Sequence, residues 1–201
     1  MVSKFDICSK ALNDLGEDTI NSFTDDTSRA RTCGLIYPEY IQYLLSLHPW
    51  KFTLTKVQLA RLVTAPLNKW TYAYQLPSDM LILRAVYESN NVSAIPITNW
   101  EKFNNTIQAD QSEIYVDYQQ QVLEENFPAY FVEFVVQAMA AKIARSITDD
   151  QNIVAEKKLE AWGSPANNYN GGAFGVAKKL DGMQTPTLQI PADDLLAARI
   201  S

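Results

Sequence analysis

The spacing of apolar residues changes twice along this chain of 201 residues, and each change restricts what the chain can fold into. Apolar side chains first recur at helical spacing, as at Phe5, Cys8 and Leu12. From Lys51 apolar and polar residues alternate as in half-buried strands, and residues 129–147 are again helical and apolar on nearly every side. We therefore predict an α+β fold, an antiparallel helical bundle of N- and C-terminal helices with an inserted antiparallel β module.

The same pattern sets the expected domain boundaries. Residues 1–49 and 124–170 are predicted to form the helical bundle, residues 50–123 the β module, and residues 171–201 a C-terminal arm. The arm differs in composition, because five of the seven glycines and three prolines lie in the last 39 residues. Its glycine-rich start, Gly171 to Gly175, is interpreted as a hinge.

Capping residues and prolines predict where the helices begin and end. Ser3 and Thr27 precede the first two helical patterns, and Asp149 or Asp150 precedes the last one, which ends at Trp162. Pro38 lies inside the second pattern and cannot donate a backbone hydrogen bond, so a kink or a break is expected there.

Within the β module the clearest strands alternate apolar and polar residues, at 52–59, 70–76, 80–87 and 113–118. The stretch from Asn99 to Thr106 does not alternate as clearly. We interpret it as a single helical turn whose Trp100 and Phe103 point inward.

Charge and hydropathy restrict the classes of function. The chain has 17 basic and 23 acidic residues, a net charge of −6, which is the reverse of the balance that phosphate-binding proteins need. The longest apolar run, residues 127–141, is too short to span a bilayer, and the first residues lack the apolar core of a signal peptide. We expect a soluble protein made in a cytoplasm, with no membrane partner and no specific binding of DNA.

Residues that carry catalysis are few. A zinc site of nitrogen and sulfur ligands would need at least three such residues clustered, and the chain has only one histidine, His48, and two cysteines, Cys8 and Cys33. We interpret the cysteines as small buried side chains. His48 and Cys33 lie about four helical turns apart, too far for a thiol dyad. The three adjacent acid pairs fall at expected caps or loops: Asp25/Asp26, Glu124/Glu125 and Asp149/Asp150. We predict no catalytic, cofactor-binding or metal-binding residue and no enzyme.

Charge is also distributed unevenly along the chain. Residues 51–84 carry five bases and one acid, whereas residues 103–141 carry six acids and no base. Patches of opposite sign on one chain suit head-to-tail contact between copies. The alternative is that the two stretches lie beside each other within one sheet.

The end of the arm is apolar but too short to make a core of its own. Its composition is richer in leucine and isoleucine than that of a disordered spacer. We therefore predict that the arm docks on a partner through its aliphatic side chains, Leu188, Ile190, Leu195, Leu196 and Ile200.

Several segments of the first half resemble one protein family. They run from Ala11 to Glu17 (ALNDLGE), Ile20 to Asp26 (INSFTDD), Ala30 to Cys33 (ARTC), His48 to Phe52 (HPWKF) and Trp70 to Pro77 (WTYAYQLP). Together they resemble the head-to-tail adaptors of short-tailed bacteriophages, the tail tubular protein A type. The resemblance is strong over about the first 85 residues and looser through the helix at 129–147.

That resemblance implies a structural protein of the virion, located in its tail or neck and assembled in the host cytoplasm. It implies a ring, commonly of twelve copies, that binds the portal protein on one face and the tail nozzle protein on the other, with tail fibres attached near it. DNA would pass through the lumen without specific binding, which an acidic ring suits because it repels phosphates.

Two alternatives remain open at this point. A stopper or a tail terminator would be a structural protein with different neighbours in the neck or tail. A small carboxylate-based hydrolase of cell-wall glycan would need two acids from separate segments that face each other across a cleft.

Overall fold

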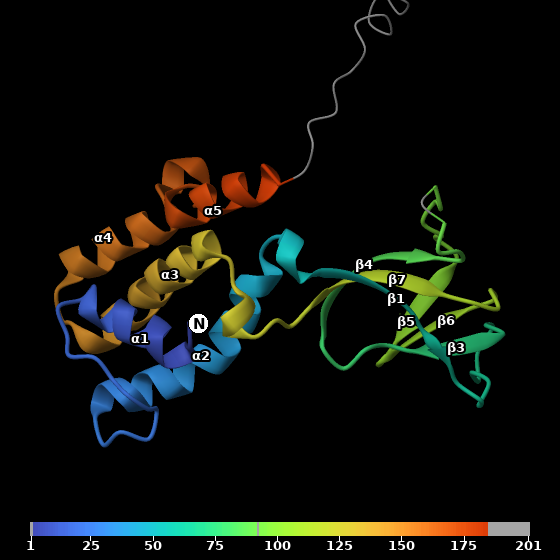
Figure 1. The fold of residues 1–201 in the computed structure, drawn as a ribbon, viewed down its shortest axis with the longest axis horizontal. Helices are drawn as coiled ribbons and strands as arrows, with labels where there is room; N and C mark the ends of the chain where they lie inside the picture. Colours follow the sequence, from blue (N-terminus) through green and yellow to red (C-terminus); the bar gives the residue numbers. More distant parts are fainter. Residues whose placement is uncertain (1, 92, 185–201) are drawn as a thin grey trace, which may run out of the picture.

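A computed structural model describes residues 2–91 and 93–184 of the chain. Helices gather at one end of an elongated molecule and strands at the other (Figure 1). The described residues form five α-helices and two antiparallel sheets without a closed barrel, so the predicted α+β class is confirmed.

The helices follow the capping signals of the sequence. Ser3 accepts a hydrogen bond from the Asp6 backbone N–H at 3.2 Å and forms a capping box with it, Thr27 accepts from the Ala30 N–H at 3.1 Å, and Asp150 caps the fourth helix. The predictions at these caps are confirmed. The helices are α1 (Lys4–Asn13), α2 (Ser28–Ser46), α3 (Ala129–Ile147), α4 (Gln151–Trp162) and α5 (Gly172–Gly182).

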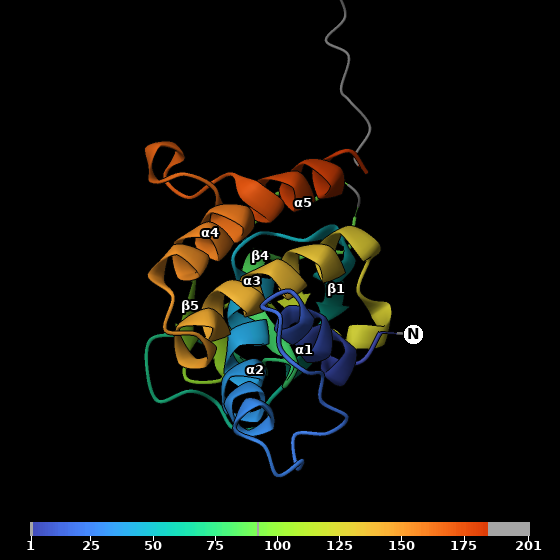
Figure 2. The same ribbon diagram turned by 90° about the vertical axis from the view of Figure 1, so that its left-hand side faces the viewer.

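Helix α3 occupies the centre of the helical part. It contacts the other four helices, and Figure 2 shows it between α1 and α2 on one side and α4 and α5 on the other. Apolar residues all round α3 are buried accordingly, among them Phe131 and Phe134. Trp50 is buried against both phenylalanines. The short 3₁₀ helix η1 (Lys51–Thr53) follows directly and leads out of this core.

The strands form two small sheets. One has the order β1-β7-β4 and the other β2-β3-β6-β5, with all pairs antiparallel. The two sheets share one apolar core, to which both contribute, for example through Tyr74 and Val116. The strands are β1 (Leu54–Gln58), β2 (Ala60–Arg61), β3 (Tyr72–Gln75), β4 (Met80–Tyr87), β5 (Trp100–Phe103), β6 (Thr106–Ala109) and β7 (Tyr115–Gln120).

Of the kink or break predicted at Pro38, the break is absent, since α2 runs without interruption from Ser28 to Ser46. Tyr37 and Ile41 are buried on either side of the proline. Packing of this apolar face stabilises the helix more than the loss of one backbone hydrogen bond destabilises it.

The helical turn predicted for residues 99–106 is wrong. Trp100–Phe103 and Thr106–Ala109 form the hairpin β5–β6, which turns through Asn104 at a φ of 52°. Phe103 points to solvent rather than inward and is 56% exposed. Asparagine tolerates the left-handed region, which makes the two-residue turn possible.

The hinge predicted at Gly171–Gly175 is also wrong. Gly172 begins α5, which packs on α3 and α4, so part of the predicted arm belongs to the helical core. A Cβ on Gly163, whose φ is 78°, would lie 2.6 Å from the Gly171 Cα. Glycine is therefore needed for the tight turn that brings α5 back against α4.

Candidate interaction surfaces

The predicted partner-binding residues of the arm lie outside the described part of the chain. Leu188, Ile190, Leu195, Leu196 and Ile200 all follow residue 184. The candidate surfaces of the described residues therefore lie elsewhere in the chain.

The most connected polar cluster surrounds Asp181 on α5. This carboxylate has no exposed surface, and it accepts hydrogen bonds from the Tyr130 hydroxyl at 2.7 Å and the Lys51 backbone N–H at 3.0 Å. The His48 Nε2 atom lies 3.5 Å from its other oxygen. Asp181 thus joins α5 and α3 to residues 48–53, which we call the junction segment because they connect α2 to β1.

A second buried side chain holds the junction segment from the opposite part of the fold. Gln119 on β7 donates hydrogen bonds from its Nε2 to the backbone oxygens of His48, at 2.7 Å, and Leu45, at 3.2 Å. The same atom donates to the Thr53 hydroxyl at 3.1 Å. The junction segment is therefore fixed by α5 on one side and by the sheet on the other.

The protonation of this cluster follows from its burial. Partial burial lowers the pKa of His48 below its ordinary value, although the Asp181 carboxylate opposes the shift, so the imidazole is neutral at pH 7. Burial and the hydrogen bond to Asp181 raise the pKa of Tyr130 to about 12. A carboxylate that is fully buried and already engaged cannot reach a substrate, so we interpret the cluster as structural.

The acid pairs of the sequence have local roles where the structure shows contacts. Asp25 accepts hydrogen bonds from the backbone of Asn21 and Ser22, and Asp26 pairs with Arg31. Glu124 accepts from the Tyr37 hydroxyl at 3.1 Å. Among residues 2–91 and 93–184 no cluster of three histidine, cysteine or acidic side chains has the geometry to hold a metal ion.

The two cysteines contact each other inside the helical core. Cys8 on α1 and Cys33 on α2 are both fully buried and not disulfide-bonded. The hydrogen bond that Cys8 donates to Cys33, together with burial, raises the pKa of the Cys8 thiol, which keeps it protonated and unreactive. The interpretation as small buried side chains is confirmed.

A concave surface lies over α2, α3 and α4. It is a groove of about 750 Å³, and an adjoining pocket of about 280 Å³ shares three of its residues. Leu35 on its wall is 80% exposed, an unusual fraction for a large aliphatic side chain. We call this surface the α2–α4 groove, and its lining includes Leu35, Glu39, Tyr40, Tyr43, Ala141, Lys142, Lys158, Trp162 and Tyr169.

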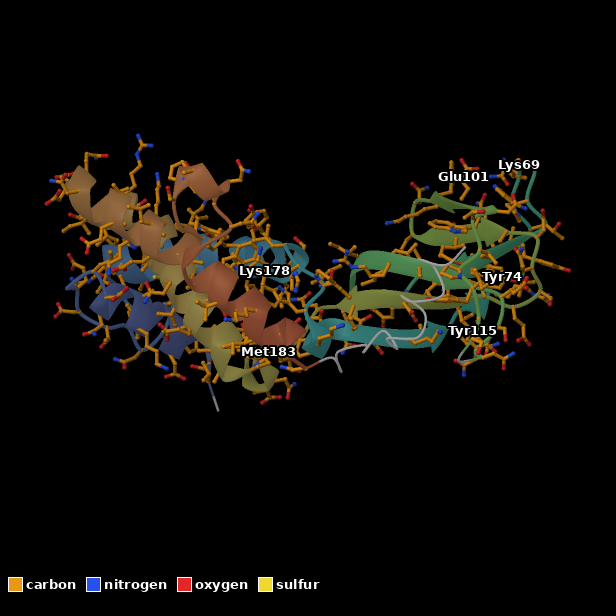
Figure 3. All side chains as sticks on the ribbon, turned by 90° about the horizontal axis from the view of Figure 1, so that it is seen from above. Lys69, Tyr74, Glu101, Tyr115, Lys178 and Met183 are labelled. Atoms are coloured by element: carbon orange, nitrogen blue, oxygen red, sulfur yellow. The ribbon has the colours of Figure 1, made fainter. Side chains whose placement is uncertain are left out.

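A second apolar surface is the loop between β2 and β3, residues 62–71. Val63 and Leu67 in this loop are completely exposed. The flanking Arg61 lies over the Tyr72 ring, and Lys69 lies at the far end of the molecule from the helices (Figure 3). We call it the β2–β3 loop.

A third apolar surface lies on α5. Phe174, Ala177 and Asp181 face inward, whereas Val176, Leu180 and Met183 form an exposed stripe at helical spacing. Figure 3 shows Met183 near the end of α5, on the side of the helical part that lies nearer the sheets. We call this stripe the α5 outer face.

At one position the structure distinguishes the two interpretations of the uneven charge, which are contact between copies and neighbours within one sheet. Lys56 on β1 lies opposite Asp117 on β7, and the two side chains approach to 3.7 Å. For this pair the alternative of neighbours within one sheet is right. Among the described residues Arg61 and Lys69 have no carboxylate within 4 Å.

One signal in the sequence points to the α2–α4 groove. The buried face of α2 carries Ala30, Cys33, Tyr37, Ile41 and Leu44, the apolar pattern of the helix. Leu35 and Tyr43 lie off this face, and large apolar residues outside the core stripe mark candidate contact surfaces. The β2–β3 loop has no such periodic signal.

Comparison with known proteins does not assign the chain. No protein-family model and no curated protein matches its sequence. The resemblance to phage adaptors therefore stays a prediction. Among the helices of the described residues, none is long and apolar enough to cross a membrane.

Proposed function

We propose that the chain is the head-to-tail adaptor of a short-tailed bacteriophage. It is a component of the virion neck, assembled in the host cytoplasm, and it forms a ring between the portal protein and the tail nozzle protein, with tail fibres attached nearby. In this proposal the helices constitute an antiparallel bundle into which the β module is inserted. DNA passes through the lumen without specific contacts.

One observation supports this proposal beyond the sequence resemblance. Exposed apolar side chains occur in the strand part of the molecule, at Val63 and Leu67 in the β2–β3 loop, and in the helical part, at Val176 and Leu180 on the α5 outer face. Contiguous apolar surface on a soluble domain marks contact with other proteins. Separate surfaces on different parts of the molecule suit a subunit that contacts several neighbours at once.

Ring formation adds a geometric requirement. A heterologous contact, in which one surface of a subunit binds a different surface of the next, closes into a ring when the rotation permits. The β2–β3 loop and the α5 outer face are two such different surfaces. The net charge of −6 per copy suits a conduit in which phosphates must slide rather than bind.

Sedimentation of the purified chain with the portal protein of the same phage tests the proposal. A discrete complex with about one copy per portal subunit is expected. The double variant Val63→Asp, Leu67→Asp changes only exposed side chains and is expected to weaken assembly without unfolding the chain, whereas Ile95→Asp, at an exposed position outside the named surfaces, serves as a matched control. Binding to the nozzle protein but not to the portal would place the chain elsewhere in the tail, and binding to neither would refute the adaptor function.

A further inference from the structure

The α2–α4 groove combines aromatic walls with two unpaired lysines. Tyr40, Tyr43 and Trp162 line it, and Lys142 lies 5.3 Å from the centre of the Tyr40 ring. Among the described residues neither Lys142 nor Lys158 has a carboxylate within 4 Å. Glu39 also lines the groove, so the two lysines leave it with one excess positive charge, which favours a ligand that is both apolar and acidic.

The chain itself contains a segment of that chemistry. Residues 185–201, which follow the described part, carry five leucine or isoleucine side chains. Two adjacent acids, Asp193 and Asp194, stand between Ile190 and Leu195. Apolar side chains on both sides of an acidic pair match aromatic walls with lysines beside them.

Chain length permits this segment to reach the groove. The Gly171 N–H donates a hydrogen bond to the Trp162 carbonyl at 3.0 Å, so α5 begins next to a residue that lines the groove. The 11 residues of α5 carry the chain about 16 Å away. The six Cα–Cα steps from Gly182 to Leu188, where the docking segment begins, span up to about 20 Å when extended, which is enough for the return.

We infer that the α2–α4 groove is the docking site for residues 188–200 of the same chain. The aliphatic side chains of the arm cover Leu35, Tyr43 and Trp162, and Asp193 and Asp194 pair with Lys142 and Lys158. This contact does not depend on the adaptor function, because groove and arm belong to one chain. It gives the predicted arm a definite receptor on the described surface.

A fluorophore that tryptophan quenches on contact tests the docking in the full-length chain. It is attached at Ala197→Cys, a small arm residue, since Cys8 and Cys33 are fully buried and do not compete for the label. Docking predicts low emission that rises in Trp162→Phe. It also predicts that Lys142→Glu with Lys158→Glu shifts the docked-to-free ratio by roughly tenfold, and that 1 M salt acts in the same direction.

Exchanging the charges of the two partners is the decisive experiment. Adding Asp193→Lys and Asp194→Lys to the two groove substitutions is expected to restore low emission. Lys102→Glu with Lys179→Glu, exposed lysines outside the groove, is the matched control and is expected to change nothing. Emission that ignores both Trp162→Phe and the groove charges would overturn the inference, as would quenching that depends on protein concentration, because a second copy would then supply the segment.

Discussion

Substitution of Asp181 is expected to detach α5 from the rest of the fold. Asp181→Ala leaves the partly buried Lys51 N–H and Tyr130 hydroxyl without their acceptor, and each such group costs about 1–3 kcal/mol. The free energy of unfolding is therefore expected to fall by about 3–5 kcal/mol, a large part of the stability of a single domain. Asp181→Asn keeps one acceptor oxygen and is expected to cost about half as much.

Urea denaturation followed by circular dichroism measures both changes. Asp18→Asn is the matched control, because Asp18 is exposed and its ion pair with Arg29 contributes less than about 1 kcal/mol. If Asp181→Ala lowers the free energy of unfolding by less than 1 kcal/mol, the buried hydrogen bonds do not hold α5 and the reasoning fails. Amide hydrogen exchange in α5 reports on the same contact, and protection there is expected to drop first.

Three further predictions concern Phe174, His48 and the β2–β3 loop. Phe174→Ala removes the aromatic side chain that packs on Trp162. It is expected to lower the free energy of unfolding by about 3 kcal/mol in the same denaturation assay, and an unchanged midpoint would contradict the packing. The folded-state pKa of His48 is lowered, so the unfolded chain binds its proton more readily and stability falls as the pH drops through 6.5. A His48→Gln variant is expected to flatten the slope in thermal melts over that range, and an identical slope would show that other groups cause it. Val63→Asp with Leu67→Asp is expected to leave the unfolding free energy within about 0.5 kcal/mol, because both side chains are fully exposed, and a larger loss would show that the loop packs against the fold.

Two of the helices could be predicted to the residue from the sequence. The helical pattern at 129–147 and the aspartate before Gln151 coincide with the observed helices α3 and α4. These signals are local, since a cap and a 3.6-residue period depend only on neighbouring residues. The strands at 72–75 and 80–87 were found for the same reason.

The elements that the sequence did not predict depend on contacts between distant residues. The hairpin β5–β6 exists because β6 pairs with β3, more than thirty positions earlier in the chain. Helix α5 begins with glycines, which are poor helix formers, and it is stabilised by Phe174 in the aromatic core and by Asp181 at the junction segment. The candidate surfaces were hard to predict for a related reason, because exposure of Leu35 or Val63 shows only once the core residues are known.

The junction segment links the two separate apolar cores of the molecule through hydrogen bonds. Gln119 from the sheet and Asp181 from α5 both bind its backbone, and both are fully buried. Buried hydrogen bonds lose much of their energy when their geometry changes, so they restrict rotation of the strands relative to the helices. Rotation of the β2–β3 loop relative to the α5 outer face is then restricted within each copy. A ring subunit needs this property, because the angle between its two contact surfaces determines how many copies close the ring.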